Sequence, residues 1–219
     1  MKKIFYTFLF LVLIILTGSL FFLSTIGFET DKFNNLIAKE LKKKEPSASV
    51  KINKIKIKLD LINFDLYLKT DNASIEYQNI NIPIQEFRAY FKLISFVKNQ
   101  PQLHRAVVLT DSIKIKDLQK IAIRIKPSNF KSYLLNNIEG GELTKGNFDL
   151  KFEKDLKIIK YEASGKLKTV NAKTSSGIEI KNISLNFILD KELVLINSIN
   201  ANYKGISLVN GKIEIEKKK

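Results

Sequence analysis

Apolar and polar residues alternate strictly along most of the chain. In KINKIKIKLDLINFDLYLKT (residues 51–70), the segment IKIKLDL alternates without a break, and the phase changes at Asn63. A period of two places neighbouring side chains on opposite faces of a β-strand. We therefore predict strands over residues 49–60 and 63–70, each with one apolar face and one face rich in lysine.

The same alternation predicts strands over most of the remaining chain. Before residue 140 the predicted strands are short and cover residues 73–77, 80–84, 87–91, 107–116 and 121–126. After residue 140 five longer ones follow, GNFDLKFE, IIKYEASGKLKT, GIEIKNISLNFILD, ELVLINSINANYK and GISLVNGKIEIE. Short turns between consecutive strands are typical of an antiparallel meander. The pattern thus predicts a mainly β chain with about ten or eleven strands.

Two short segments have a helical period instead. In TDKFNNLIAKELKKK (residues 30–44), apolar residues recur at i, i+3, i+4 and i+8, and Thr30 or Asp31 can cap the start. In SNFKSYLLNNI (residues 128–138), the apolar residues share one face, and Gly140 follows where a left-handed glycine ends many helices. We also expect a helical turn within LISFVKNQPQ. The first helix can plug the near end of a sheet, lie on a membrane surface, or simply connect its neighbours.

The N-terminal segment contains no charged residue between Ile4 and Phe28. About 20 apolar residues span a bilayer as a helix, whereas the core of a signal peptide has roughly 7–15. We therefore predict an uncleaved transmembrane anchor over residues 4–28. The basic residues before it favour a cytoplasmic tail of residues 1–3, which places residues 29–219 outside the cytoplasm.

The distribution of glycine divides the rest of the chain. Residues 29–48 are predicted to hold the first amphipathic helix and a linker, and residues 49–219 to form the β domain. No glycine occurs in residues 28–139, but seven occur from there to the end. The β domain is therefore expected to have two subregions, residues 49–139 and 140–219.

The formal net charge of +15 allows two interpretations. An anionic partner such as nucleic acid would attract so basic a chain. However, only three of the 37 basic residues are arginines, which nucleic-acid-binding proteins use for bidentate contacts. The lysines are also spread along the chain and do not form one patch. We therefore attribute the charge to a general use of lysine at solvated positions and expect no nucleic-acid partner.

The sequence offers few residues that could perform chemistry. It has no cysteine, which excludes disulfides and thiolate metal sites, and His104 is its only histidine. No Gly-rich phosphate loop, catalytic triad or pair of carboxylates stands out. We therefore expect a protein that is not an enzyme and that has neither a cofactor nor a metal site.

The apolar strand faces raise the question of what covers them. A domain normally buries such faces against a second layer, and the two predicted helices are too short to provide one. The sheet must therefore close into a barrel or sandwich, or leave an apolar trough. Alternation alone does not distinguish these possibilities.

The order of the elements resembles the AsmA-like family of bacterial envelope proteins. An anchor (Ile4–Phe28), an amphipathic helix (Asp31–Lys44) and an alternating strand (Ile52–Leu61) follow one another as in that family. The segment IPIQEFRAYFKLISFVKNQPQLHRAVV resembles its succession of strand, helical turn and strand. The segments EGGELTKGNFDLKFE, YEASGKLKT and YKGISLVNGKIEIE resemble its later strands. The resemblance covers essentially the whole chain and rests on this pattern, without a signature motif.

This resemblance implies one long antiparallel sheet curled into a β-groove, a taco-like shape whose apolar interior is open along one side. Such bridge-like lipid-transfer proteins carry phospholipid between the inner and outer membranes of Gram-negative bacteria and serve outer-membrane homeostasis. It also implies a single-pass inner-membrane protein with its C-terminal domain in the periplasm. Its partners would be phospholipid acyl chains, the inner membrane and other envelope proteins. About eleven strands span only about 50 Å, which is short for the family.

Two alternatives stay open at this point. One is a closed β-domain that acts as a scaffold in envelope assembly, and the other is the short anchored jelly-roll of lipopolysaccharide transport. If the sheet forms a groove, the parity of the alternation selects fourteen lining residues: Ile55, Ile57, Leu59, Leu61, Phe64, Leu66, Leu68, Phe148, Leu150, Phe152, Ile183, Leu185, Phe187 and Leu189.

Overall fold

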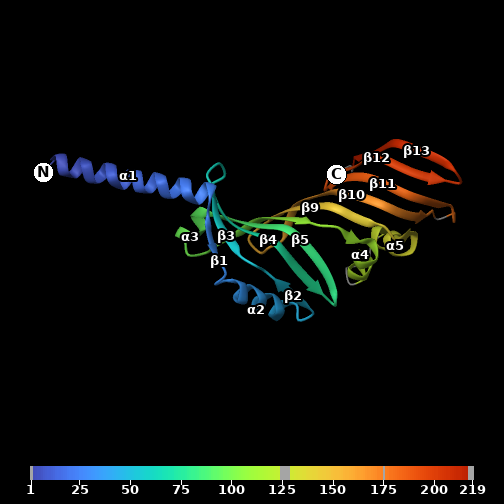
Figure 1. Ribbon diagram of the computed structural model, residues 1–219, viewed down its shortest axis with the longest axis horizontal. Helices are drawn as coiled ribbons and strands as arrows, with labels where there is room; N and C mark the ends of the chain where they lie inside the picture. The colour runs from blue at the N-terminus through green and yellow to red at the C-terminus, as the bar shows by residue number, and fades with distance from the viewer. Residues whose placement is uncertain (1, 124–128, 175, 217–219) are drawn as a thin grey trace.

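The protein consists of an apolar N-terminal helix followed by one large, strongly twisted antiparallel sheet (Figure 1). The computed structural model describes residues 2–123, 129–174 and 176–216. These residues contain thirteen strands and few short helices, so the chain is mainly β, as the alternation predicts.

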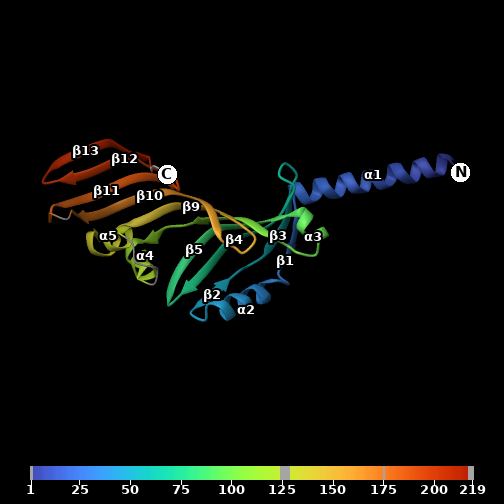
Figure 2. The same ribbon diagram turned by 180° about the vertical axis from the view of Figure 1, so that it is seen from behind.

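Helix α1 (Lys2–Thr25) is long and apolar enough to cross a membrane, and it projects away from the sheet in Figures 1 and 2. The chain turns at Gly27, whose φ is +79°, and enters the short strand β1 (Phe28–Thr30). Strand β1 pairs with β3, and Phe28 lies opposite Ile57. The sheet therefore begins directly after α1. The sequence instead predicts that residues 29–48, an amphipathic helix and a linker, separate the anchor from the β domain.

Helix α2 (Asn34–Lys44) begins later than predicted, because neither Thr30 nor Asp31 caps it. The side-chain amide of Asn34 instead donates to the carbonyl oxygens of Ile52 (3.0 Å) and Asn53 (2.9 Å). These contacts lie at the gap between β2 (Ala48–Lys51) and β3 (Ile55–Asp60). The single strand predicted over residues 49–60 is therefore split in two.

The next strands are longer than predicted and join pairs of predicted strands. Strand β4 (Asp65–Tyr77) and strand β5 (Ile80–Lys92) pair over their whole lengths. Asn72 has a φ of +52°, so the backbone of β4 changes the face of its side chains there without ending the strand. The strands predicted over residues 63–70 and 73–77 are therefore parts of one element.

Helix α3 (Leu93–Val97) follows β5 and matches the predicted helical turn. Strands β6 (Leu103–Thr110) and β7 (Ile113–Lys114) come next. The prediction of further strands up to residue 126 is wrong, because helix α4 (Ile115–Ala122) occupies most of that segment. Residues 124–126 lie outside the described residues.

Helix α4 has apolar residues at helical spacing, Ile115, Leu118 and Ala122, and Lys120 pairs with Asp117 one turn earlier (3.0 Å). Helix α5 (Asn129–Asn137) confirms the helix predicted over residues 128–138. The side-chain amide of Gln119 on α4 donates to the carbonyl oxygens of Leu134 and Ile138, both at 2.8 Å. The two helices are thereby held together at the side of the sheet.

The C-terminal half is the predicted meander. It comprises β8 (Ile138–Glu139), β9 (Glu142–Phe152), β10 (Ile158–Lys173), β11 (Glu179–Asp190), β12 (Leu193–Tyr203) and β13 (Ile206–Glu216). Gly140 has a φ of +69° but follows β8, and so does not end the helix directly as predicted. Gly141 has a φ of +90°, and a Cβ there would lie 2.8 Å from the Cα of Val170.

The strands pair in the order β1-β3-β4-β5-β6-β9-β10-β11-β12-β13, while β2, β7 and β8 extend neighbouring strands lengthwise. No pairing between the end strands β1 and β13 occurs among the described residues. The sheet is therefore open, as the β-groove prediction requires. A sheet closed into a barrel does not match this architecture.

Candidate functional site

The register of the sheet aligns apolar side chains of successive strands into continuous rows. Residues directly opposite each other in an antiparallel pair lie on the same face. One row runs through six strands: Ile57, Leu68, Ala89, Ala106, Leu150 and Tyr161. A second runs through β5 to β13: Phe87, Val108, Phe148, Ala163, Leu189, Val194 and Ile215. We call the surface that carries these rows the apolar face.

Two shorter rows continue the apolar face in the C-terminal half. They consist of Ile113, Leu143, Leu167 and Leu185, and of Gly165, Phe187, Ile196 and Ile213. Gly165 makes room for its neighbours, because a Cβ there would lie 2.8 Å from Leu143 Cδ1 and 3.2 Å from the ring of Phe187. The ring of Phe187 thus lies over the backbone of β10 at this position.

The short helices pack mainly along the margins of the sheet. Helix α2 contacts β2, helix α4 contacts β7 and β8, and α3 contacts β5. In Figures 1 and 2 they lie beside the strand ends. They therefore do not form a helical layer over the long strands β9 to β13.

The apolar face is buried in the centre of the sheet and exposed at the edge strand β13. In the centre of the N-terminal half, Ala89 and Ala106 are only 7% and 5% exposed. At the other end, Ile213 and Ile215 on β13 are 47% and 51% exposed. The apolar face is therefore most accessible at β13, the edge of the sheet farthest from α1 along the strand order.

The opposite face carries charged side chains joined into networks. The Lys69 ammonium lies 2.5 Å from a carboxylate oxygen of Glu86 and 3.2 Å from Asp71, and Arg88 also pairs with Glu86. Burial raises the pKa of the Glu86 carboxyl, but the hydrogen bond from Lys69 and the charges of Arg88 and Lys69 outweigh it, so this pKa lies below its ordinary value. We call this surface the charged face.

Aromatic rings cover part of the charged face. Tyr67 and Tyr90 stack with ring centroids 5.1 Å apart, and the guanidinium of Arg105 lies 5.1 Å from the Tyr90 centroid. Together with the ion pairs, these contacts satisfy the charges of the face within the sheet. In the N-terminal half these side chains are partly buried, and Tyr90 is only 6% exposed.

Twelve of the fourteen predicted lining residues lie on strands of the sheet, on its apolar face. Pairs such as Ile57 with Leu68 and Leu59 with Leu66 show the shared face directly. Leu61 and Phe64 do not lie on strands: they belong to the turn between β3 and β4, and both are exposed. The predicted change of phase at Asn63 is this turn.

Sequence reasoning missed the apolar residues contributed by the other strands. These are Phe87, Ala89, Ala106 and Val108 on β5 and β6, and Val194, Ile196, Ile213 and Ile215 on β12 and β13. These residues also alternate with polar ones in the sequence. However, knowing which residues of one strand share a face does not show which residues of the next strand lie on that same face. Only the register provides that information.

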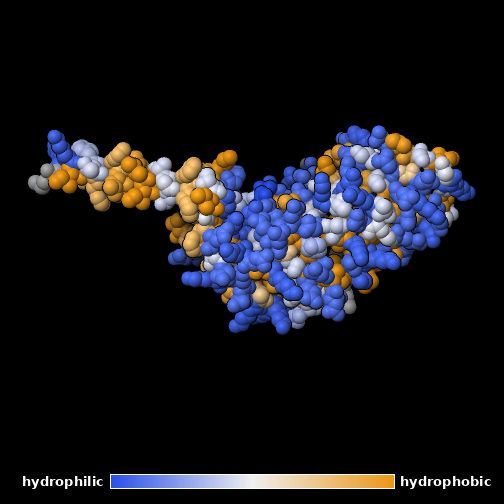
Figure 3. All heavy atoms as spheres, in the orientation of Figure 1, coloured by the Kyte–Doolittle hydropathy of each residue, from blue (hydrophilic) through white to orange (hydrophobic). Residues whose placement is uncertain are grey.

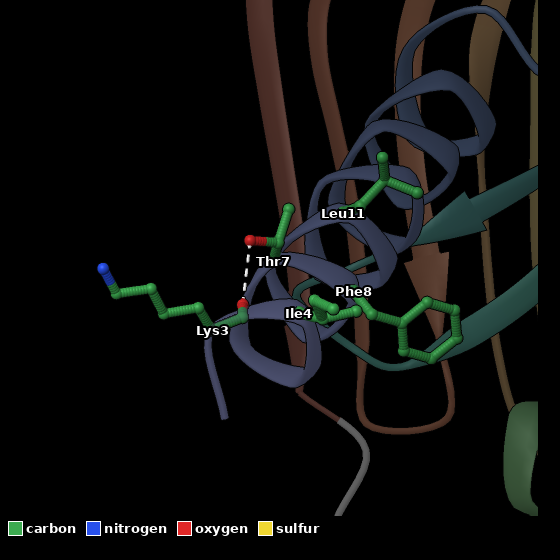
Figure 4. A pocket seen from close by; sticks show the side chains of 5 residues that line it. All are labelled: Lys3, Ile4, Thr7, Phe8 and Leu11. Atoms are coloured by element: carbon green, nitrogen blue, oxygen red, sulfur yellow. Dashed lines mark hydrogen bonds between the residues drawn. The ribbon is translucent and has the colours of Figure 1, made fainter. Parts of the chain in front are cut away.

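His104, the only histidine in the sequence, contacts the carboxylate of Asp65. The Nε2 atom of His104 lies 2.9 Å from a carboxylate oxygen of Asp65, at the start of β6. Within the described part of the chain, no three His, Asp or Glu side chains are placed to hold a metal ion. A shallow hollow on α1 is lined by Lys3, Ile4, Thr7, Phe8 and Leu11 (Figure 4). It lies on the helix that is able to cross a membrane.

Figure 3 shows one side of the molecule as mainly hydrophilic, with hydrophobic side chains on α1, at the base of α1 and near β12 and β13. The candidate functional site is the apolar face itself, an extended surface whose rows cross successive strands. Comparison with protein-family models, with curated proteins and with solved structures gives no match to this chain.

Proposed function

We propose that this protein is a membrane-anchored envelope protein that holds the acyl chains of phospholipids on the apolar face of its sheet. The observation that supports this function is the continuity of the apolar rows. They begin at Ile57, next to the strand that leaves α1, and reach Ile215 on the last strand. The sheet that carries them is open, and its last strand, β13, exposes apolar side chains.

Lipid would replace the missing second layer. Removing one methylene group from water contributes about 0.8 kcal/mol, so a dozen buried methylenes offset much of the cost of leaving a bilayer. The rows contain aliphatic and aromatic side chains without a specific polar partner, so they would bind acyl chains of many kinds. Phospholipid headgroups would stay in water at the margin of the sheet, where lysine ammonium groups can meet phosphate.

The proposed setting is the bacterial envelope. Helix α1 would be a single-pass anchor in the inner membrane, with Lys2 and Lys3 on the cytoplasmic side and the sheet in the periplasm. There the protein would carry phospholipid between the inner and outer membranes as a member of the AsmA-like family, in contact with other envelope proteins. This function involves no chemical reaction and no cofactor.

The experiment that tests the proposal compares two neighbouring positions of β11. Phe187 lies on the apolar face opposite Gly165 and Ile196, whereas Ile188 lies on the other face opposite Ser164 and Leu195. A photo-crosslinking amino acid is placed at either position in the full chain, and the crosslinked products are identified in cells by mass spectrometry. We expect phospholipid adducts at Phe187 and few or none at Ile188.

A second readout uses the same pair. Phe187→Arg should reduce the phospholipid that copurifies with the full chain, while Ile188→Arg should leave it unchanged. Equal lipid adducts at both positions, or adducts with protein alone at Phe187, would argue against the proposed function.

A further inference from the structure

Exposed apolar side chains gather where α1 meets the sheet. They come from three segments: the residues after α1, the turn between β3 and β4, and helix α3. Ile62 is 90% exposed and Val97 is 77% exposed, and four others are also largely exposed. We call these six residues the anchor-side patch: Ile26, Phe28, Ile62, Phe64, Ile94 and Val97.

The three segments are held next to the end of α1. The ammonium of Lys58 on β3 donates to the carbonyl oxygen of Thr25, the last residue of α1, at 2.6 Å. The backbone N–H of Leu93, the first residue of α3, donates to the carbonyl oxygen of Phe64 in the turn (3.2 Å). In both Figures 1 and 2, α3 and the turn after β3 lie at the end of the sheet from which α1 emerges.

The turn that carries Ile62 and Phe64 is built by hydrogen bonds. The carboxylate of Asp60 accepts the backbone N–H groups of Ile62 (3.0 Å) and Asn63 (3.2 Å) and the side-chain amide of Asn63 (2.8 Å). Phe64 has a φ of +52°, a conformation that a bulky residue rarely adopts. The turn therefore holds its apolar side chains outward in a fixed arrangement.

Helix α3 is fixed in a similar way. The buried hydroxyl of Ser95 donates to the carbonyl oxygen of Lys92 (2.5 Å) and accepts the backbone N–H of Gln102 (3.1 Å). This side of α3 faces the sheet, so Ile94 and Val97 remain exposed to the surroundings.

The bilayer that α1 can span is the surface nearest to this patch. About 20 apolar residues cross a bilayer, and 20 residues from Ile4 end at Leu23, so the last turn of α1 lies at the membrane–water interface. Apolar side chains next to that turn are at the depth where interfacial segments insert. Two exposed lysines, Lys92 and Lys98, flank α3 and can meet anionic headgroups.

We propose that the anchor-side patch inserts into the interface of the bilayer that α1 spans. The β3–β5 end of the sheet then rests against one leaflet, and the apolar face begins at the level of the lipids. This contact does not depend on the proposed lipid-carrying function, because an anchored scaffold with the same patch would rest on the membrane in the same way.

Tryptophan fluorescence tests this contact, because the chain contains no tryptophan. The variants Ile62→Trp and Val97→Trp report on the patch. The control is Ile188→Trp on β11, away from α1, where the side chain lies on the face opposite the apolar face and is 39% exposed. Each full-length variant is reconstituted into vesicles of phosphatidylcholine and phosphatidylglycerol, with or without phosphatidylcholine brominated on its acyl chains.

We expect bromine to remove most of the emission of Ile62→Trp and Val97→Trp and little of the emission of Ile188→Trp. Unquenched emission from both patch variants, with circular dichroism spectra like that of the unmodified chain, would overturn the proposal. Blue-shifted emission that depends on protein concentration but not on bromine would also overturn it, since a second copy of the chain would then cover the patch.

Discussion

Arg105 on β6 forms a bidentate ion pair with Asp149 on β9. The guanidinium Nε lies 2.9 Å from Oδ1, and Nη2 lies 2.6 Å from Oδ2. The two residues are separated by 44 positions, which include β7, α4, α5 and β8. This pair therefore joins the two predicted subregions of the chain, at the step of the main strand path from β6 to β9.

We expect Arg105→Ala to lower the free energy of unfolding by about 1–2 kcal/mol, because a bidentate, partly buried pair is stronger than an exposed one. The cycle of Arg105→Ala, Asp149→Ala and the double variant should give a coupling energy of about 1 kcal/mol, measured by denaturant unfolding of the full chain in detergent. The matched control is Lys212→Ala with Glu214→Ala on β13, an exposed pair whose coupling should fall below about 0.5 kcal/mol. Equal coupling in both cycles would contradict this ranking.

The stability of the charged face should depend on pH through Glu86. The pKa of this carboxyl lies below its ordinary value in the folded chain, so its ionised form stabilises the fold. The contribution is complete above the pKa of the unfolded chain, about 4.3, and is lost as the pH falls through the lower folded pKa.

We therefore expect Glu86→Gln to destabilise the full chain by about 1–2 kcal/mol at pH 7, since Lys69 and Arg88 then lose a shared, largely buried partner. The difference from the unmodified chain should shrink below about pH 4. Unfolding midpoints measured across this pH range check the prediction. Glu162→Gln, an exposed carboxyl on the same face, should change stability little at either pH; a loss as large as that of Glu86→Gln would show that position on the face does not matter.

Gly140 and Gly141 form a natural matched pair. Both have positive φ values, but a Cβ at Gly140 meets no atom within 4 Å, whereas one at Gly141 would collide with the backbone of Val170 and Lys168. We expect Gly140→Ala to cost about 1 kcal/mol from strain alone and Gly141→Ala about 3 kcal/mol, because overpacking adds to the strain. Thermal or denaturant unfolding of both variants measures the difference, and similar costs would contradict the close approach of β10 to Gly141.

Amide hydrogen exchange should be uneven along the sheet. Strand β13 pairs on one side only, and its residues are mostly exposed, whereas β5 pairs on both sides and includes several buried residues. Strands with few buried contacts open at low free-energy cost. Mass spectrometry of exchanged peptides should therefore show the fastest strand exchange in β13 and slow exchange in β5, and the reverse order would contradict the observed burial.

The sequence predicts the elements of this protein better than their boundaries. The alternation and the apolar N-terminal run identify α1, most strands and the open sheet, because these depend on local pattern. The segment around α4 was misassigned, since Ile113 and Ile115 fit a strand while Ile115, Leu118 and Ala122 fit a helix. Its helical form is supported by contacts of Gln119 with α5, which no local pattern contains.

For the candidate site too, the sequence predicts what depends on local pattern and does not predict what depends on contacts between distant residues. Parity correctly groups residues within a strand, such as Phe148 with Leu150, but the rows across strands depend on register. The break between β2 and β3 depends on Asn34, which lies 18 residues from its partner Ile52. Such distant contacts are decided by the folded chain as a whole.

The order of pairing also affects how the protein can form. Nearly every long strand pairs with the strand that follows it in the chain, so most contacts close short loops and the relative contact order is low for a β protein. Each new strand can add to the edge left by the previous one, as units do in a solenoid. The sheet can therefore assemble progressively, starting beside the N-terminal helix, while later residues are still being synthesised.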